Sequence, residues 1–87
     1  MALYGADIAQ LRQLSGQLNA KANDIQSIVS QLTSAITSVE WRGPDAERFK
    51  SDWQSQHVAQ LKQVINALQN ASQQASKNAQ DQEVASS

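Results

Sequence analysis

A glycine and a proline stand side by side at the midpoint of the chain, in VEWRGPDAERF (residues 39–49). Trp41 precedes this pair by two positions, and two carboxylates follow it within three residues. Gly43 can adopt a left-handed conformation that ends a helix, and Pro44 suits the first turn of a helix because its missing N–H is not needed there. The carboxylates favour the positive end of the new helix dipole. The stretch therefore predicts that one helix ends and another begins here.

Apolar residues before this break recur at alternating steps of four and three. The stripe consists of Tyr4, Ile8, Leu11, Ser15, Leu18, Ala22, Ile25, Val29, Leu32, Ile36 and Val39. Ser15 is its one small polar member, and we expect Leu14 beside it to cover the gap. Asp7 followed by Gln10 resembles an N-terminal capping pair. The pattern predicts a helix over about residues 7–40 that packs on other helices.

A second stripe follows the break. It consists of Ala46, Phe49, Trp53, His57, Leu61, Val64, Leu68, Ala71 and Ala75, spaced by three or four residues. The stripe predicts a turn at residues 41–44 and a helix over about residues 45–79. The last stretch has no clear packing face, so we expect a flexible tail at residues 80–87.

Two helices of similar length joined by a short turn are expected to be antiparallel neighbours. The predicted fold is therefore all-α, a single helical hairpin spanning residues 1–87. Two helices that touch along one seam cannot enclose a core, so we expect two hairpins to pair into a four-helix bundle, as a homodimer or a heterodimer. The predicted interface within and between hairpins comprises Leu11, Leu18, Ile25, Val29, Leu32, Ile36, Phe49, Trp53, Leu61, Val64 and Leu68.

Composition argues against catalysis and against nucleic-acid binding. The formal net charge is −1, from seven basic and eight acidic residues, and this balance provides no basic face. The chain has no cysteine and one histidine, His57, with no nucleophile and acid on its helix face. We therefore expect no enzyme activity, no metal and no cofactor.

Targeting signals of the common kinds are not expected. No apolar run approaches the roughly 20 residues of a membrane span, and the polar faces carry few basic residues, so we do not expect membrane binding. The first 14 residues lack a basic region followed by a continuous apolar stretch, so no cleavable secretory signal is expected.

A helical hairpin of this length with Trp-x-Gly at its bend resembles the WXG family, the Esx-type small substrates of type VII (ESX) secretion systems. The motif here is Trp41, Arg42 and Gly43, and the resemblance covers nearly the whole chain. It implies a dimeric four-helix bundle with a copy of itself or a related WXG-type protein. It also implies export of the folded protein, without a cleaved signal peptide, from the cytoplasm by a type VII secretion ATPase. Some family members act as virulence factors, and others as chaperones or adaptors.

The chain departs from the family pattern after the second helix, where the resemblance implies Tyr-x-x-x-Asp/Glu. The one tyrosine is Tyr4, and Lys77 and Ala79 stand four residues before the acidic Asp81 and Glu83. Two interpretations follow: a partner chain supplies the tyrosine, or Ala79, Asp81 and Glu83 form a degenerate signal. The alternative function is a non-secreted structural or chaperone-like hairpin that pairs with another helical protein.

Overall fold

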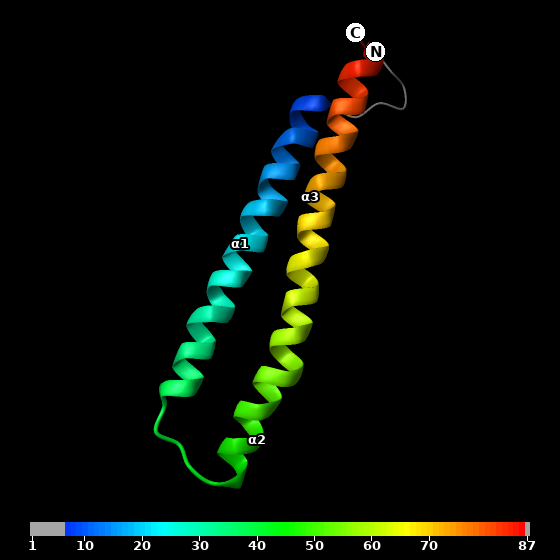
Figure 1. Ribbon diagram of the computed structural model, residues 1–87. Coiled ribbons are helices and arrows are strands. Elements are labelled where there is room, and N and C mark those ends of the chain that lie inside the picture. Colours follow the sequence, from blue (N-terminus) through cyan, green and yellow to red (C-terminus); the bar gives the residue numbers. More distant parts are fainter. Residues whose placement is uncertain (1–6, 87) are drawn as a thin grey trace.

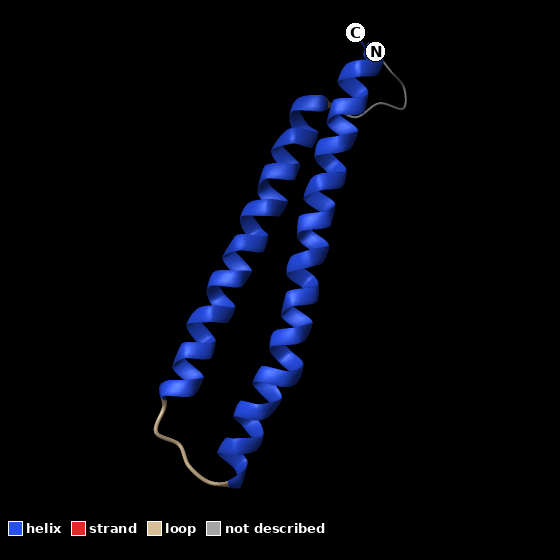
Figure 2. Cartoon of the chain, viewed as in Figure 1, coloured by secondary structure: helices blue, strands red, loops and turns tan. Residues whose placement is uncertain are grey.

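The protein is an antiparallel helical hairpin in the computed structural model, which describes residues 7–86 (Figure 1). The segments are α1 (Ile8–Ser38), α2 (Pro44–Asp52), the π-helical turn η1 (Trp53–His57) and α3 (Val58–Ser86). α2, η1 and α3 follow one another without a break and form the second rod of the hairpin (Figure 2). The described residues contain no strand, so the predicted all-α hairpin is confirmed. Tyr4, the first residue of the predicted stripe, lies outside the described range.

Side-chain hydrogen bonds define both ends of α1. At its start, the side chain of Asp7 accepts a hydrogen bond of 3.0 Å from the backbone N–H of Gln10, as predicted. At its end, the hydroxyls of Thr37 and Ser38 donate to the backbone carbonyls of Thr33 and Ser34, at 2.9 and 2.7 Å. These bonds add to the helical hydrogen bonds of the last turn, and the next residue, Val39, is already extended. α1 therefore ends at Ser38, about two residues earlier than predicted.

Gly43 acts at the start of α2 and not at the end of α1. Its φ of 116° and ψ of 173° describe an extended backbone with positive φ. Residues other than glycine rarely adopt this conformation. The prediction that Gly43 ends the first helix in a left-handed conformation is therefore wrong. Its carbonyl accepts the first helical hydrogen bond, 3.1 Å from the N–H of Glu47, and Pro44 is the first residue of α2, as predicted.

The seam of α1, meaning its least exposed side, follows the predicted spacing except at Leu32 and at Val39, which is exposed beyond the end of the helix. Its members are Ile8, Leu11, Ser15, Leu18, Ala22, Ile25, Val29, Thr33 and Ile36. Thr33 takes the place expected for Leu32, which is exposed. Ser15 lies in the seam itself, and Leu14, which was expected to cover its gap, is exposed.

The second rod differs more from its predicted stripe because of η1. Each hydrogen bond of a π-turn spans five residues, and here the N–H of Val58 bonds to the carbonyl of Trp53. The extra residue moves alternate positions of the seam forward by one beyond Trp53, while Leu61, Leu68 and Ala75 stay in it. The observed seam continues through Val58, Leu61, Ile65, Leu68, Ser72, Ala75, Ala79 and Gln82. Three positions of the predicted stripe after Trp53 are exposed instead: His57, Val64 and Ala71; Phe49, before it, is exposed as well.

α3 continues to Ser86, so the predicted helix end near residue 79 and the flexible tail at 80–87 are wrong over 80–86. Burial explains the extension: Ala79 is fully buried and Gln82 is half-buried, which continues the seam by two turns. Small side chains at this end allow the two helices to stay close. The sequence pattern did not indicate the extension because alanine and glutamine are weak hydrophobic signals.

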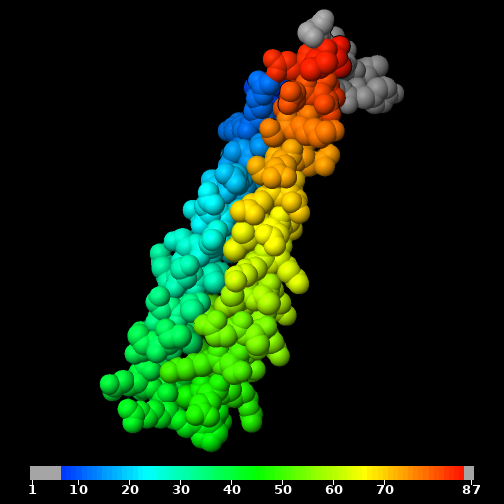
Figure 3. Space-filling view, in the orientation of Figure 1, coloured from blue at the N-terminus to red at the C-terminus, as the bar shows by residue number. Residues whose placement is uncertain are grey.

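The hairpin is long and has little interior. It measures 64 × 17 × 15 Å, and its radius of gyration is 19.3 Å, against about 12 Å for a compact domain of this length. Side chains close the gap between the two rods along the face seen in Figure 3. The buried apolar residues are Ala22, Val29, Ala46, Ile65, Ala75 and Ala79, and no large side chain among the described residues is fully buried. One seam therefore supplies most of the packing.

Candidate protein-binding surfaces

One flank of the seam is apolar and exposed. Leu14, Ile28 and Leu32 of α1 and Val64 of α3 have relative exposures of 44% to 52%. Their spacing at 3.6 residues per turn places them on the same side of the seam, next to the half-buried Leu18 and Leu68. A shallow groove on this side is lined by Leu14, Leu18, Ala20 and Leu68 and, at its polar edge, by Gln17 and Lys21. We call Leu14, Ile28, Leu32 and Val64 the apolar face.

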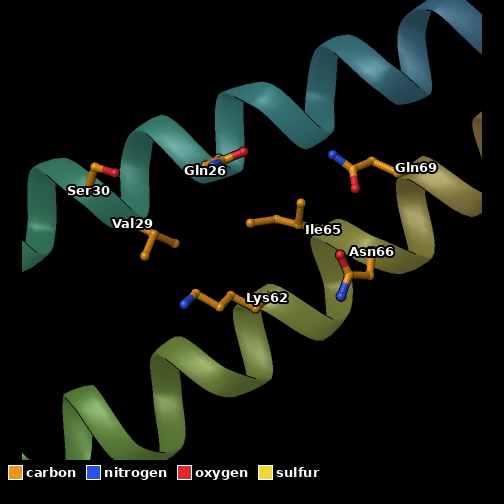
Figure 4. Close-up of a pocket in the computed structure, with 7 residues that line it drawn as sticks. All are labelled: Gln26, Val29, Ser30, Lys62, Ile65, Asn66 and Gln69. Carbon is orange, nitrogen blue, oxygen red and sulfur yellow. The ribbon is translucent and has the colours of Figure 1, made fainter.

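The opposite flank of the seam is polar (Figure 4). A groove there is lined by Gln26 and Ser30 of α1 and by Lys62, Asn66 and Gln69 of α3. The seam residues Val29 and Ile65 form its floor. We call this side the polar face. Because large apolar side chains gather on one flank and amides on the other, the hairpin as a whole is amphipathic.

The exposed area of the chain is large for its mass. The chain exposes 6680 Å², whereas a compact monomer of the same mass exposes about 5,000 Å². The excess, about 1,600 Å², is larger than the roughly 800 Å² that each partner buries in a standard protein–protein interface. The excess reflects the elongated shape of the single hairpin, which leaves more surface in contact with water than a compact fold would.

The bend presents a pair of aromatic rings. The rings of Trp41 and Phe49 lie 5.6 Å apart with an interplanar angle of 54°, which is a tilted aromatic contact. Both side chains, together with Val39, remain about half exposed. The N–H of Trp41 donates to the carbonyl of Val39 at 3.0 Å, so the backbone folds tightly just before the ring. We call Trp41 and Phe49 the aromatic corner.

Trp53 has a different role, although it follows Phe49 in the same predicted stripe. Its indole N–H donates a hydrogen bond of 2.9 Å to the hydroxyl of Thr33 across the seam. Its ring also lies 6.1 Å from that of His57, which is exposed. No signal in the sequence pointed to Thr33, a polar residue beside the predicted stripe member Leu32. Trp53 therefore joins the two rods, while Trp41 stays at the surface.

The predicted interface residues separate into two groups. Eight of them lie in the seam, buried or half-buried: Leu11, Leu18, Ile25, Val29, Ile36, Trp53, Leu61 and Leu68. The other three, Leu32, Phe49 and Val64, are exposed. Leu32 and Val64 belong to the apolar face, and Phe49 belongs to the aromatic corner. These three are available for a contact outside the hairpin.

The residues of the suggested C-terminal signal are engaged within the hairpin. Ala79 is fully buried in the seam. The carboxylate of Asp81 lies 3.6 Å from the ammonium of Lys77 in the same helix, and the carboxylate of Glu83 pairs with the guanidinium of Arg12 in α1. The turn residue Arg42 is exposed. Ala79, Asp81 and Glu83 therefore lie close together near the C-terminal end of α3, at the end of the hairpin away from Trp41.

The described part of the chain holds no group of three or more histidine or acidic residues that could bind a metal ion. None of the described helices combines the length and the apolar character that a membrane crossing requires. Comparison of the chain with family models, curated proteins and solved structures gave no match.

Proposed function

We propose that the protein is a binding module whose apolar face pairs with a second helical hairpin, a copy of itself or a related chain, to form a four-helix bundle. The carrying observation is the exposure of Leu14, Ile28, Leu32 and Val64 on one flank of the seam. Burial of apolar area contributes about 25 cal/mol per Å², so an interface here would add stability that the thin seam does not provide. The polar face would remain in water and keep the bundle soluble.

We further propose that the module is a secreted or secretion-adaptor protein of the WXG kind, working with a type VII secretion ATPase and exported without a cleavable signal peptide. Two features of the bend support this proposal. Trp41 is about half exposed beside its ring partner Phe49, and Gly43 holds a positive φ that fixes the sharp turn. A side chain displayed on a rigid bend is suited to protein binding because little entropy is lost when it is bound.

An export assay tests this proposal directly. In a bacterium that carries a type VII system, we expect Trp41→Ala to reduce the amount of protein in the culture supernatant at least tenfold, with the cytoplasmic level unchanged. The matched control is Val39→Ala, which removes an equally exposed apolar side chain two residues away. Equal export of both variants and the unaltered protein would contradict the role given to Trp41, and absence of the unaltered protein from the supernatant would contradict the assignment to secretion.

A second candidate is a non-secreted structural or chaperone-like hairpin. The observation that favours it is the engagement of Asp81 and Glu83 by Lys77 and Arg12, together with the lack of a tyrosine after the bend. A partner chain that supplies the tyrosine would reconcile this observation with export. Under the structural alternative, Trp41→Ala alters the stability of the bundle and leaves the location of the protein unchanged.

A further inference from the structure

Two hydrogen-bonded contacts join the rods at and beyond the π-turn η1. The indole N–H of Trp53, the first residue of η1, donates to the hydroxyl of Thr33. Further along α3, Ser72 exchanges hydrogen bonds with Ser15 of α1. All four side chains are partly buried in the seam, so each contact requires its residues to face the opposite rod. We call the Thr33–Trp53 and Ser15–Ser72 contacts the two anchors.

The anchors are spaced differently on the two rods. Thr33 and Ser15 lie eighteen residues apart in α1, which is five turns of a regular α-helix at 3.6 residues per turn. Trp53 and Ser72 lie nineteen residues apart in the second rod. In a regular helix, the extra residue would rotate Ser72 by about 100° from the line of Trp53, so both anchors could not form together. η1 absorbs this residue, because a π-turn holds one residue more than an α-turn.

Without the π-turn, the same sequence has a second possible seam. In a regular helix continued from Trp53, the alternate positions facing α1 would be those of the predicted stripe: His57, Val64 and Ala71. Two of these are apolar, and Leu61 and Leu68 belong to the seam in either case. Ile65, which lies between the helices in Figure 4 and is 7% exposed, would turn outward to the place that Asn66 now has on the polar face.

We propose that η1 is a phase joint, held in its π-turn form by the two anchors. In this form Val64 lies on the apolar face; conversion of the joint to a regular helix moves Val64 into the seam and Ile65 out to the polar face. π-turns are rare, and the hydrogen bonds of the anchors offset the cost of this one. The joint thus decides whether Val64 is offered to a second hairpin, a consequence that rests on the proposed function. A partner that binds Val64 would stabilise the π-turn form.

A single-residue deletion tests the spacing argument. Deletion of the exposed Gln56 leaves eighteen residues between Trp53 and Ser72, so a regular helix satisfies both anchors. We expect its midpoint of urea unfolding to equal or exceed that of the unaltered protein at the same protein concentration. The matched control is deletion of Asn23, an exposed amide residue between the anchors on α1. It breaks the five-turn spacing with no π-turn to compensate, and should lower the midpoint.

A thiol at position 65 reports the form of the joint. The chain has no cysteine, so Ile65→Cys introduces a single thiol, covered by α1 in the π-turn form and exposed in the regular form. Combining Ser15→Ala with Ser72→Ala removes one anchor, and we expect thiol labelling at position 65 to accelerate about tenfold. With Gln56 also deleted, labelling should stay slow, because the regular helix then keeps position 65 in the seam.

Leu68→Cys is the matched reporter. Leu68 lies in the seam in both forms of the joint, so its labelling should not change when the serine anchor is removed. Accelerated labelling at position 65 alone therefore measures rotation of α3, whereas equal acceleration at both positions measures unfolding.

Three results would each overturn the phase joint: a midpoint lowered as much by deletion of Gln56 as by deletion of Asn23, labelling at position 65 that the serine substitutions leave unchanged or accelerate equally at position 68, and acceleration that persists after deletion of Gln56. These readouts do not depend on pairing or export, since the proposed bundle leaves the polar face in water. A chain that passes them but stays monomeric or is not exported would contradict the proposed function and leave the joint in place.

Discussion

Ser15 and Ser72 exchange hydrogen bonds across the seam, each hydroxyl donating to the backbone carbonyl of the other residue. The distances are 2.8 Å from Ser15 Oγ to the Ser72 carbonyl and 2.7 Å from Ser72 Oγ to the Ser15 carbonyl. Both side chains are partly buried, so an alignment of the helices shifted by one turn would place the hydroxyls against apolar neighbours such as Leu68 or Ala75. The pair therefore specifies the register of the hairpin.

Removing one hydroxyl of this pair should weaken the hairpin. We expect Ser72→Ala to lower the free energy of unfolding by about 1 kcal/mol relative to Ser76→Ala, an exposed serine one turn further along α3. The comparison cancels the gain in helix propensity that both alanines share. Urea unfolding at one fixed protein concentration measures the difference, because the stability of a dimer depends on concentration. Equal midpoints for the two variants would show that the serine pair contributes nothing.

The Trp53–Thr33 hydrogen bond leads to a second prediction. Thr33→Val keeps the shape of the side chain but leaves the partly buried indole N–H without its acceptor, which should cost about 1–2 kcal/mol. Thr37→Val is the matched control, because the hydroxyl of Thr37 is exposed and bonds only to carbonyls of its own helix. Thermal unfolding should show a lower midpoint for Thr33→Val than for the control. Coincident midpoints would contradict the role given to this bond.

The two glycines described by the structure should respond to alanine with opposite signs. Gly16 lies inside α1, and a Cβ built there meets nothing within 4 Å, so Gly16→Ala should stabilise the protein by about 1 kcal/mol. Gly43 has a φ of 116°, so Gly43→Ala should destabilise it by about 1–3 kcal/mol. Urea unfolding of both variants checks the signs. Stabilisation by Gly43→Ala would mean that the bend is not held in the described conformation.

The heptad spacing predicted the hairpin and nearly all of the α1 seam, since a stripe of large aliphatic residues has few alternatives to a packed helix. It did not predict η1, because a π-turn changes the phase of a helix without any residue type that marks it. That single turn moved His57, Val64 and Ala71 out of the seam. Their exposure follows from backbone geometry and not from their hydrophobicity.

The apolar face could be predicted in part from the sequence. Leu14, Ile28 and Leu32 were visible as apolar residues in or beside the stripe, but the spacing alone assigned Leu32 to the seam and used Leu14 to cover Ser15. Whether a residue lies in the seam or at the surface depends on which polar side chains form hydrogen bonds across the hairpin. Ser15 is hydrogen-bonded to Ser72 and Thr33 to Trp53. These two polar residues therefore occupy the seam, and the neighbouring Leu14 and Leu32 lie at the surface.

A charge placed on the apolar face should separate the proposed bundle into hairpins. We expect Ile28→Glu to weaken association at least tenfold, because the new carboxylate would be buried against an apolar partner surface. Ser30→Glu introduces the same residue two positions away on the polar face and should leave association unchanged. Size-exclusion chromatography over a dilution series compares the two variants. Association weakened by Ser30→Glu instead would place the interface on the polar face.

The central claim is that one hairpin is not stable by itself and pairs with a second hairpin to form a four-helix bundle. Sedimentation equilibrium of the purified chain, with circular dichroism on the same samples, tests this claim most directly. We predict a species of twice 9.5 kDa that loses helicity and mass together on dilution. A poorly helical monomer would assign the pairing to a related hairpin in place of a second copy. A fully helical monomer that unfolds cooperatively at every concentration would contradict the account.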